Sequence, residues 1–154
     1  WRIMKFIQKY VHWLPVVIWM GLIFYLSHQP AEQSSELSSG FMDILLHILF
    51  AIFPADGDFP YLHFFIRKAA HFFAYFLLGV FVIYAVRRSV KQLLRSTYIT
   101  LIICILYAIS DEVHQLFIPG RSGEIRDVMI DSLGAICGLF TFILIHKLTK
   151  TRHT

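Results

Sequence analysis

The sequence predicts an all-α membrane protein, with four transmembrane helices and a short re-entrant or interfacial helix on the outer side. Apolar residues make up 57% of the chain and charged residues only 16%, which leaves too few polar side chains to coat a soluble core. Four apolar stretches approach the length of about 17 to 25 residues that a bilayer requires. These stretches cover approximately 11–27, 69–86, 96–110 and 128–146, and we expect one transmembrane domain over 1–154.

The first stretch ends in Leu26-Ser27-His28-Gln29-Pro30. This sequence lacks the small-x-small pattern of a signal-peptide cleavage site, so we expect the segment to remain as a membrane anchor. A later apolar run, 41–53, contains Asp43 and His47 and is too short and too polar to span. It predicts the re-entrant or interfacial helix.

The third stretch, 96–110, is short for a span, and its ends are ambiguous. Residues 90–95 can complete it on one side or 113–118 on the other. The fourth stretch carries Gly134 and Gly138 at a spacing that allows close approach of a neighbouring helix.

Basic residues predict the orientation of the chain. They gather at the ends of the apolar stretches instead of forming one stripe, which argues against a nucleic-acid partner. With both termini in the cytoplasm, 10 of the 14 basic residues lie on the inner side, as the positive-inside rule requires. The outer side then keeps Arg67, Lys68, Arg121 and Arg126 together with all the acidic residues. We expect the chemistry on the outer side of the membrane.

Arg67, His71 and Tyr75 recur at four-residue spacing near the outer end of the second stretch, so they share one helix face. Arg67 can instead snorkel to the interface, and Tyr75 can belong to the aromatic belt. A histidine one turn inside an apolar helix usually faces the bundle interior with a partner, which favours a functional role for His71.

The third stretch ends in a dense polar segment that contains Asp111, Glu112, His114 and Gln115. Adjacent carboxylates raise each other's proton affinity, so beside a histidine they form an acid/base set or half of a cation site. Carboxylate pairs in purely structural networks share this property.

The segment 119–123 contains two glycines and Arg121, whose guanidinium can bind a phosphate or carboxylate in a bidentate manner. An exposed hairpin turn explains these residues equally well. Asp127 and Asp131 follow on one face of the fourth stretch, and we expect Arg67 or Arg121 to neutralise them.

Three segments of the chain resemble the VanZ-like family: WLPVVIWMGLIFYLSHQP at 13–30, RKAAHFFAYFLLG at 67–79 and SDEVHQLFIPGRSGEIRDVMIDSLGAICG at 110–138. The resemblance implies a family pattern at Arg67 or Lys68, His71, Tyr75, Asp111, Glu112, Gln115, Gly120, Arg121, Asp127 and Gly134. Asp131 departs from it, because the family commonly has asparagine there. Family membership implies an association with resistance to teicoplanin and related lipoglycopeptides in Gram-positive bacteria.

The leading functional hypothesis is an enzyme, a hydrolase or transferase that acts on a phosphate-bearing membrane lipid or a lipid-linked cell-wall precursor. The catalytic candidates are His71, Glu112, Asp127 and Asp111, and the substrate-binding candidates are Arg67, Tyr75, Gln115, Arg121, His114 and Asp131. The alternative is a protein that binds or shields a head group or an antibiotic without turnover. Transport ranks last, because the inner halves of the helices are nearly free of polar groups. A divalent cation fits the residue types, but no ligand spacing such as HExxH supports one.

Overall fold

The protein is described by a computed structural model that covers residues 10–30, 40 and 62–151. These residues form a 3-10 turn, η1 (Val11–Trp13), and the helices α2 (Leu14–Ser27), α4 (Leu62–Ser89), α5 (Leu93–Gln115) and α6 (Ile125–Thr151). No strand occurs within these ranges, so the all-α prediction is confirmed for them. The helix predicted at 41–53 lies outside the described residues.

Three of the helices contain segments long and apolar enough to cross a membrane: Phe64–Ser89, Leu93–Gln115 and Ile125–Thr149. The first apolar helical segment is shorter within the described residues, where η1 and α2 together run from Val11 to Ser27. At 1.5 Å per residue this segment extends for roughly 25 Å, against a hydrocarbon core of about 30 Å. Of the four predicted spans, three are thus helices long and apolar enough to cross a membrane, and the fourth is a shorter apolar helix within the described residues.

All three long helices extend beyond the apolar stretches that predicted them. The third begins at Leu93 and ends at Gln115, so it includes residues on both sides of 96–110. The second begins at Leu62, seven residues before the predicted start at 69. Charged side chains marked these boundaries in the sequence, but in the structure the helices continue through them, and two of these residues, Lys68 and Asp111, have partners on other helices.

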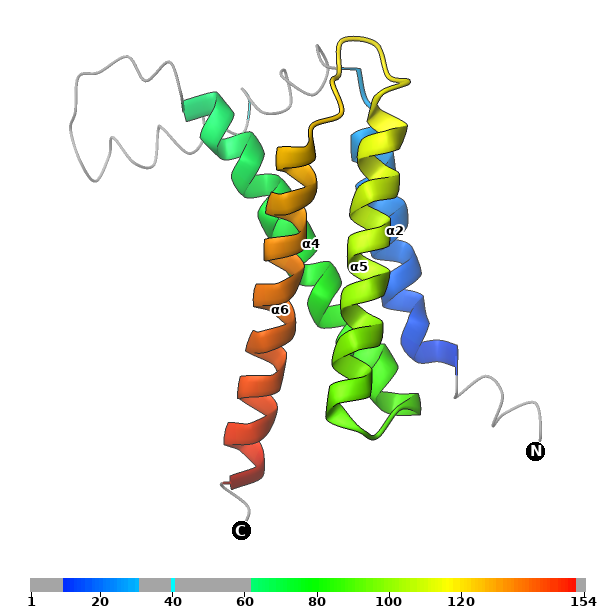
Figure 1. The fold of residues 1–154 in the computed structure, drawn as a ribbon, viewed down its shortest axis with the longest axis vertical. Coiled ribbons are helices and arrows are strands. Elements are labelled where there is room, and N and C mark those ends of the chain that lie inside the picture. Colours follow the sequence, from blue (N-terminus) through cyan, green and yellow to red (C-terminus); the bar gives the residue numbers. More distant parts are fainter. Residues whose placement is uncertain (1–9, 31–39, 41–61, 152–154) are drawn as a thin grey trace, which may run out of the picture.

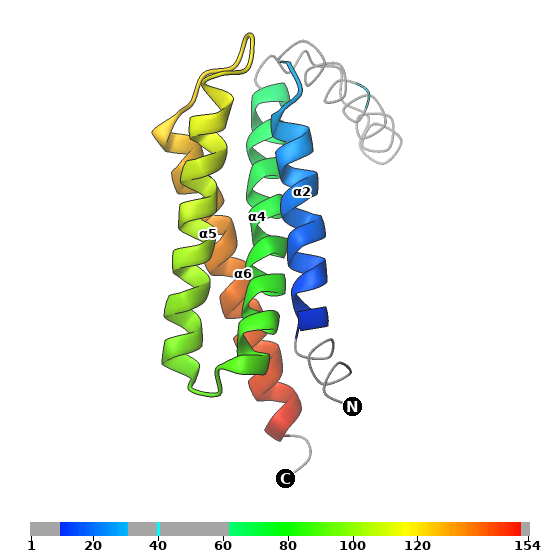
Figure 2. The same ribbon diagram turned by 90° about the vertical axis from the view of Figure 1, so that its right-hand side faces the viewer.

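The four helices lie side by side along the long axis of the bundle (Figures 1 and 2). The α4–α5 turn lies at the same end as the start of α2 and the end of α6 (Figure 1). The α5–α6 loop lies at the opposite end, with the end of α2 and the start of α4. We call this opposite end the polar end, because the four buried carboxyl groups of the described residues lie toward it: Asp111, Glu112, Asp127 and Asp131.

Glycines bring α4 and α6 into backbone contact. A methyl group added at Gly134 or Gly138 would collide with the backbone carbonyl of Phe72 or Phe76 on α4. Gly79 on α4 is equally close to the carbonyl of Ala135 on α6. Small residues at such positions permit the close approach that favours helix association in lipid. The close packing predicted from Gly134 and Gly138 is confirmed, and its partner is α4.

Two long-range hydrogen bonds attach the middle of α2 to the bundle. The indole Nε1 of Trp19 donates to the carbonyl oxygen of Ala74 at 2.8 Å. The Tyr107 hydroxyl donates to the carbonyl oxygen of Met20 at 2.6 Å. Both acceptors are backbone carbonyls within helices, so one bond runs from α2 to α4 and the other from α5 to α2.

Candidate functional site

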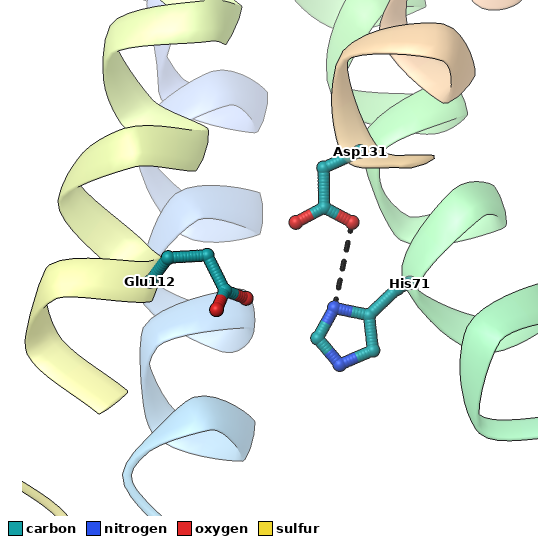
Figure 3. A group of neighbouring side chains, drawn as sticks. All are labelled: His71, Glu112 and Asp131. Atoms are coloured by element: carbon teal, nitrogen blue, oxygen red, sulfur yellow. Dashed lines mark ion pairs between the residues drawn. The ribbon is translucent and has the colours of Figure 1, made fainter. Parts of the chain in front are cut away.

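Three side chains from three different helices converge near the polar end: His71 from α4, Glu112 from α5 and Asp131 from α6 (Figure 3). We call them the trio. The trio's donor atoms, one from each residue, all lie within 4.8 Å of one another. Figure 3 shows Glu112 pointing toward the other two from the opposite side.

The closest approach within the trio joins His71 Nδ1 to Asp131 Oδ1 at 3.4 Å, an ion pair when the imidazole is protonated. Asp131 is fully buried. Neither of its carboxylate oxygens has a hydrogen-bond partner among the described residues. A buried carboxylate without hydrogen bonds is costly, so the environment of Asp131 is incomplete without a further partner.

Backbone packing explains why His71 and Asp131 meet. Gly134 lies one turn after Asp131, and its α-carbon packs against the backbone of Phe72, the residue next to His71. Larger residues at these positions would force the two helices apart. The glycine contacts therefore set the distance across which His71 and Asp131 face each other.

Glu112 is held by groups from the α5–α6 loop and from its own helix. Its Oε2 accepts a hydrogen bond from the backbone N–H of Glu124 at 2.9 Å. Its Oε1 accepts one from the Gln115 amide at 3.2 Å. Gly123 allows the α5–α6 loop to pack against the end of α5, because a Cβ atom at this position would lie 2.8 Å from the Glu112 carbonyl oxygen. Glu112 is thus oriented before any ligand binds.

Asp111 is directed toward α2. Its Oδ2 accepts a hydrogen bond from the Ser27 hydroxyl at 2.8 Å and one from the Gln115 amide at 3.3 Å. Ser27, which the sequence analysis did not single out, is the buried last residue of α2. Asp111 therefore links α2 to α5, and Gln115 links it to Glu112.

Arg121 binds the end of α2 instead of lying free to bind an anion. Its Nε donates to the carbonyl oxygen of Gln29 at 2.8 Å, and Nη2 donates to that of Leu26 at 3.1 Å. Nη1 donates to Gln115 Oε1 at 3.3 Å. Burial and the nearby Arg67 guanidinium lower the pKa of Arg121 from its ordinary value. The α5–α6 loop, which turns at Gly120 with a positive φ, thus places the Arg121 guanidinium against the carbonyl oxygens at the end of α2.

Asp127 forms an ion pair with Lys68, whose Nζ also lies 3.6 Å from Glu124 Oε2. Both members of the Lys68–Asp127 pair are largely buried. The expectation that Arg67 or Arg121 neutralises the acidic residues of α6 is therefore wrong for Asp127. The sequence did offer Lys68 as a partner for Asp127, because Lys68 is one of the four basic residues assigned to the same side of the membrane as the acidic residues.

Arg67 and Tyr75 lie on the same helix as His71, one turn before and one turn after it. Arg67 Nε and the Tyr75 hydroxyl are buried polar atoms without a hydrogen-bond partner among the described residues. The predicted stripe of Arg67, His71 and Tyr75 thus faces the interior of the bundle. Two of its three members retain unused hydrogen-bonding capacity.

His114 lies apart from the trio and contacts α2. Its Nε2 is 3.2 Å from Nδ1 of His28, and the two rings stack with centroids 5.3 Å apart. Phe24 stacks on His114 with a centroid distance of 4.5 Å. This contact contributes to the docking of α2 on α5.

The sequence profile of a family described as VanZ/LLP1 matches residues 12–146. The matched segment contains the trio and all four described helices, apart from the last residues of α6. Comparisons with curated proteins and with solved structures give no match. The resemblance inferred from the sequence is confirmed by the family profile.

Proposed function

The chain belongs to the VanZ/LLP1 family, and on this premise we propose that it binds and processes a phosphate-bearing membrane lipid or lipid-linked cell-wall precursor. The reaction takes place at the polar end of the bundle, on the extracellular side of the bacterial cytoplasmic membrane. The proposal includes the role in teicoplanin and lipoglycopeptide resistance that the family resemblance implies.

The observation that carries the proposal is the convergence of the trio on one point. His71, Glu112 and Asp131 come from three helices, and neither oxygen of the buried Asp131 carboxylate has a hydrogen-bond partner among the described residues. Ionisable groups inside a membrane protein are costly, and they are retained mainly where they serve a pathway or a site. An imidazole with two carboxylates supplies groups able to activate a water molecule or a lipid hydroxyl.

Arg67 is the group that best fits a phosphate contact. Its buried Nε lacks a hydrogen-bond partner among the described residues, and it lies one helical turn from His71. A guanidinium binds phosphate oxygens in a planar fork. Arg121 is already bound to the carbonyl oxygens of Leu26 and Gln29 at the end of α2, so we assign the anion contact to Arg67 alone.

The depth of the trio suits a lipid head group. His71 lies seven residues inside the Phe64–Ser89 segment, and Glu112 lies three residues from the end of Leu93–Gln115. At 1.5 Å per residue these positions are about 10 Å and about 5 Å from the ends of these two segments. A lipid head group at the membrane surface would therefore need to move only about 5–10 Å into the bundle to reach the trio.

A second candidate function is binding without turnover. It is favoured by the number of charges at the polar end that already have partners within the protein, namely Lys68 with Asp127 and Arg121 with α2. In this case the trio would recognise a head group or an antibiotic, and no bond would break.

The test uses purified protein in nanodiscs that contain phospholipids and polyprenyl phosphates, with products followed by phosphorus NMR. For an enzyme, Glu112→Gln should reduce turnover by about 10² to 10⁴-fold while lipid binding persists. Glu124→Gln, the same chemical change at the same end but outside the trio, should retain most of the turnover. Lipid binding without any product in the unmodified protein would establish the binding function instead.

A second experiment measures resistance in cells, with the protein expressed in a susceptible Gram-positive host. The unmodified protein should raise the teicoplanin concentration that inhibits growth, and Glu112→Gln should not, at equal membrane abundance. Equal resistance with both proteins would exclude Glu112 from the resistance mechanism.

A further inference from the structure

We propose that His71, Glu112 and Asp131 bind a divalent cation of the first transition row, Zn²⁺ or Mn²⁺. The metal site itself is argued from the geometry of the trio, and only a role of the ion in lipid processing rests on the proposed function. The three ligands come from α4, α5 and α6, so no local spacing in the sequence reveals the site.

The distances within the trio fit coordination better than hydrogen bonding. His71 Nδ1 and Asp131 Oδ1 are 3.4 Å apart, longer than an ordinary hydrogen bond between a charged donor and acceptor. Two ligand atoms that each lie about 2.0–2.1 Å from a tetrahedral zinc ion are about 3.4 Å from each other. The Glu112 oxygen lies within 4.8 Å of both, a gap that a small shift of the carboxylate can close while its two hydrogen bonds hold its orientation.

The buried Asp131 carboxylate provides an independent argument. It is completely buried, and both of its oxygens lack hydrogen-bond partners among the described residues. An imidazole placed 3.4 Å away satisfies at most one of the two oxygens. A cation would compensate the negative charges of Asp131 and Glu112 together, which a single protonated histidine cannot do.

The surroundings of Glu112 resemble the outer shell of a metal site. The Glu124 backbone N–H and the Gln115 amide each donate to one of its oxygens. Hydrogen bonds of this kind orient ligating carboxylates and increase metal affinity. Carboxylate oxygens can accept these bonds and still offer a further lone pair to an ion.

The donor set indicates which ion binds. An imidazole nitrogen suits zinc and other first-row transition ions, whereas Mg²⁺ and Ca²⁺ prefer sites composed entirely of oxygen ligands. Three protein ligands also leave positions for water or a phosphate oxygen, as in catalytic metal sites. An ion at the trio would polarise the phosphate group that the proposed function requires.

The experiment measures metal binding without any lipid substrate. Full-length protein in detergent, freed of its affinity tag and stripped with chelator, is dialysed against Zn²⁺ or Mn²⁺ and analysed by elemental mass spectrometry. The proposal expects about one bound ion per chain and a higher unfolding temperature with metal. His71→Gln, Glu112→Gln and Asp131→Asn should each weaken binding at least tenfold.

His114→Gln is the matched control, because His114 contacts His28 and not the trio. Its metal affinity should equal that of the unmodified protein. The proposal is overturned if the unmodified protein binds no ion, if all three trio variants keep full affinity, or if His114→Gln alone removes the ion. Should one trio variant fail to fold, the other two decide the result.

The two proposals can fail separately. If metal binds but no lipid is turned over, the metal site stands and the enzymatic function falls. If Asp131→Asn binds no metal yet turns over lipid normally, the ion has no role in that reaction.

Discussion

His71 on α4 and Asp131 on α6 lie 3.4 Å apart, on helices that are not consecutive in the chain. Their separation depends on neighbouring backbone contacts, since Gly134 packs against the backbone of Phe72 beside His71. The stability of the α4–α6 contact and the geometry of the trio are therefore coupled. A change in one glycine alters both.

Gly138→Ala should destabilise the protein by about 1–3 kcal/mol, because the added methyl group would collide with the backbone carbonyl of Phe76. The shift should appear in detergent unfolding curves and should also weaken metal binding at the trio. Gly21→Ala is the control. Nothing lies within 4 Å of the new methyl group there, and alanine favours a helix over glycine by about 0.5–1 kcal/mol. Equal effects of the two substitutions would contradict the packing argument.

Lys68→Met should destabilise the protein by about 3–5 kcal/mol, since it leaves the buried carboxylate of Asp127 without its partner. Adding Asp127→Leu to the same chain should restore most of the loss, because the unpaired charge is removed. The free energies of unfolding of Lys68→Met, of Asp127→Leu and of the double variant together give the interaction energy between the two side chains. Additive effects would show that the pair does not interact.

Arg121→Lys should loosen the attachment of α2 at the polar end. A lysine has no planar fork, so it cannot reproduce the bonds to the carbonyl oxygens of Gln29 and Leu26. We expect a loss of about 1–3 kcal/mol, measured by unfolding in detergent. Arg126→Lys, at an exposed position of α6, should have almost no effect. If Arg121→Lys is as stable as the unmodified protein but binds phosphate-bearing lipid weakly, Arg121 serves the anion and not α2.

The orientation can be tested by cysteine labelling in intact cells. Cys104 and Cys137 are first replaced by alanine, and single cysteines are then introduced at the exposed positions Ser122 and Ser89. These lie at opposite ends of the bundle, in the α5–α6 loop and at the end of α4. A cysteine at Ser122 should react with an impermeant reagent from outside, and one at Ser89 should not. The opposite labelling pattern would place the polar end in the cytoplasm.

The sequence alone determined the helical membrane class, the family and the segments that carry the ionisable residues. These properties depend on composition, on runs of apolar side chains and on local spacing, all of which are present before folding. The spacing of Gly134 and Gly138 likewise predicted a close contact between two helices. Helix ends were less predictable, because the charges of Lys68 and Asp111 suggested the end of an apolar span, whereas both residues are helical and have partners on another helix.

Only the tertiary structure decided which charges meet. The sequence allowed either arginine to pair with Asp127, but the packing of α4 on α6 selects Lys68. It also directs Arg121 to the carbonyl oxygens of α2 and places Asp131, expected to bind substrate, against His71. Such pairings depend on the rotation and depth of each helix relative to its neighbours, and these are set by side-chain packing between segments far apart in the chain.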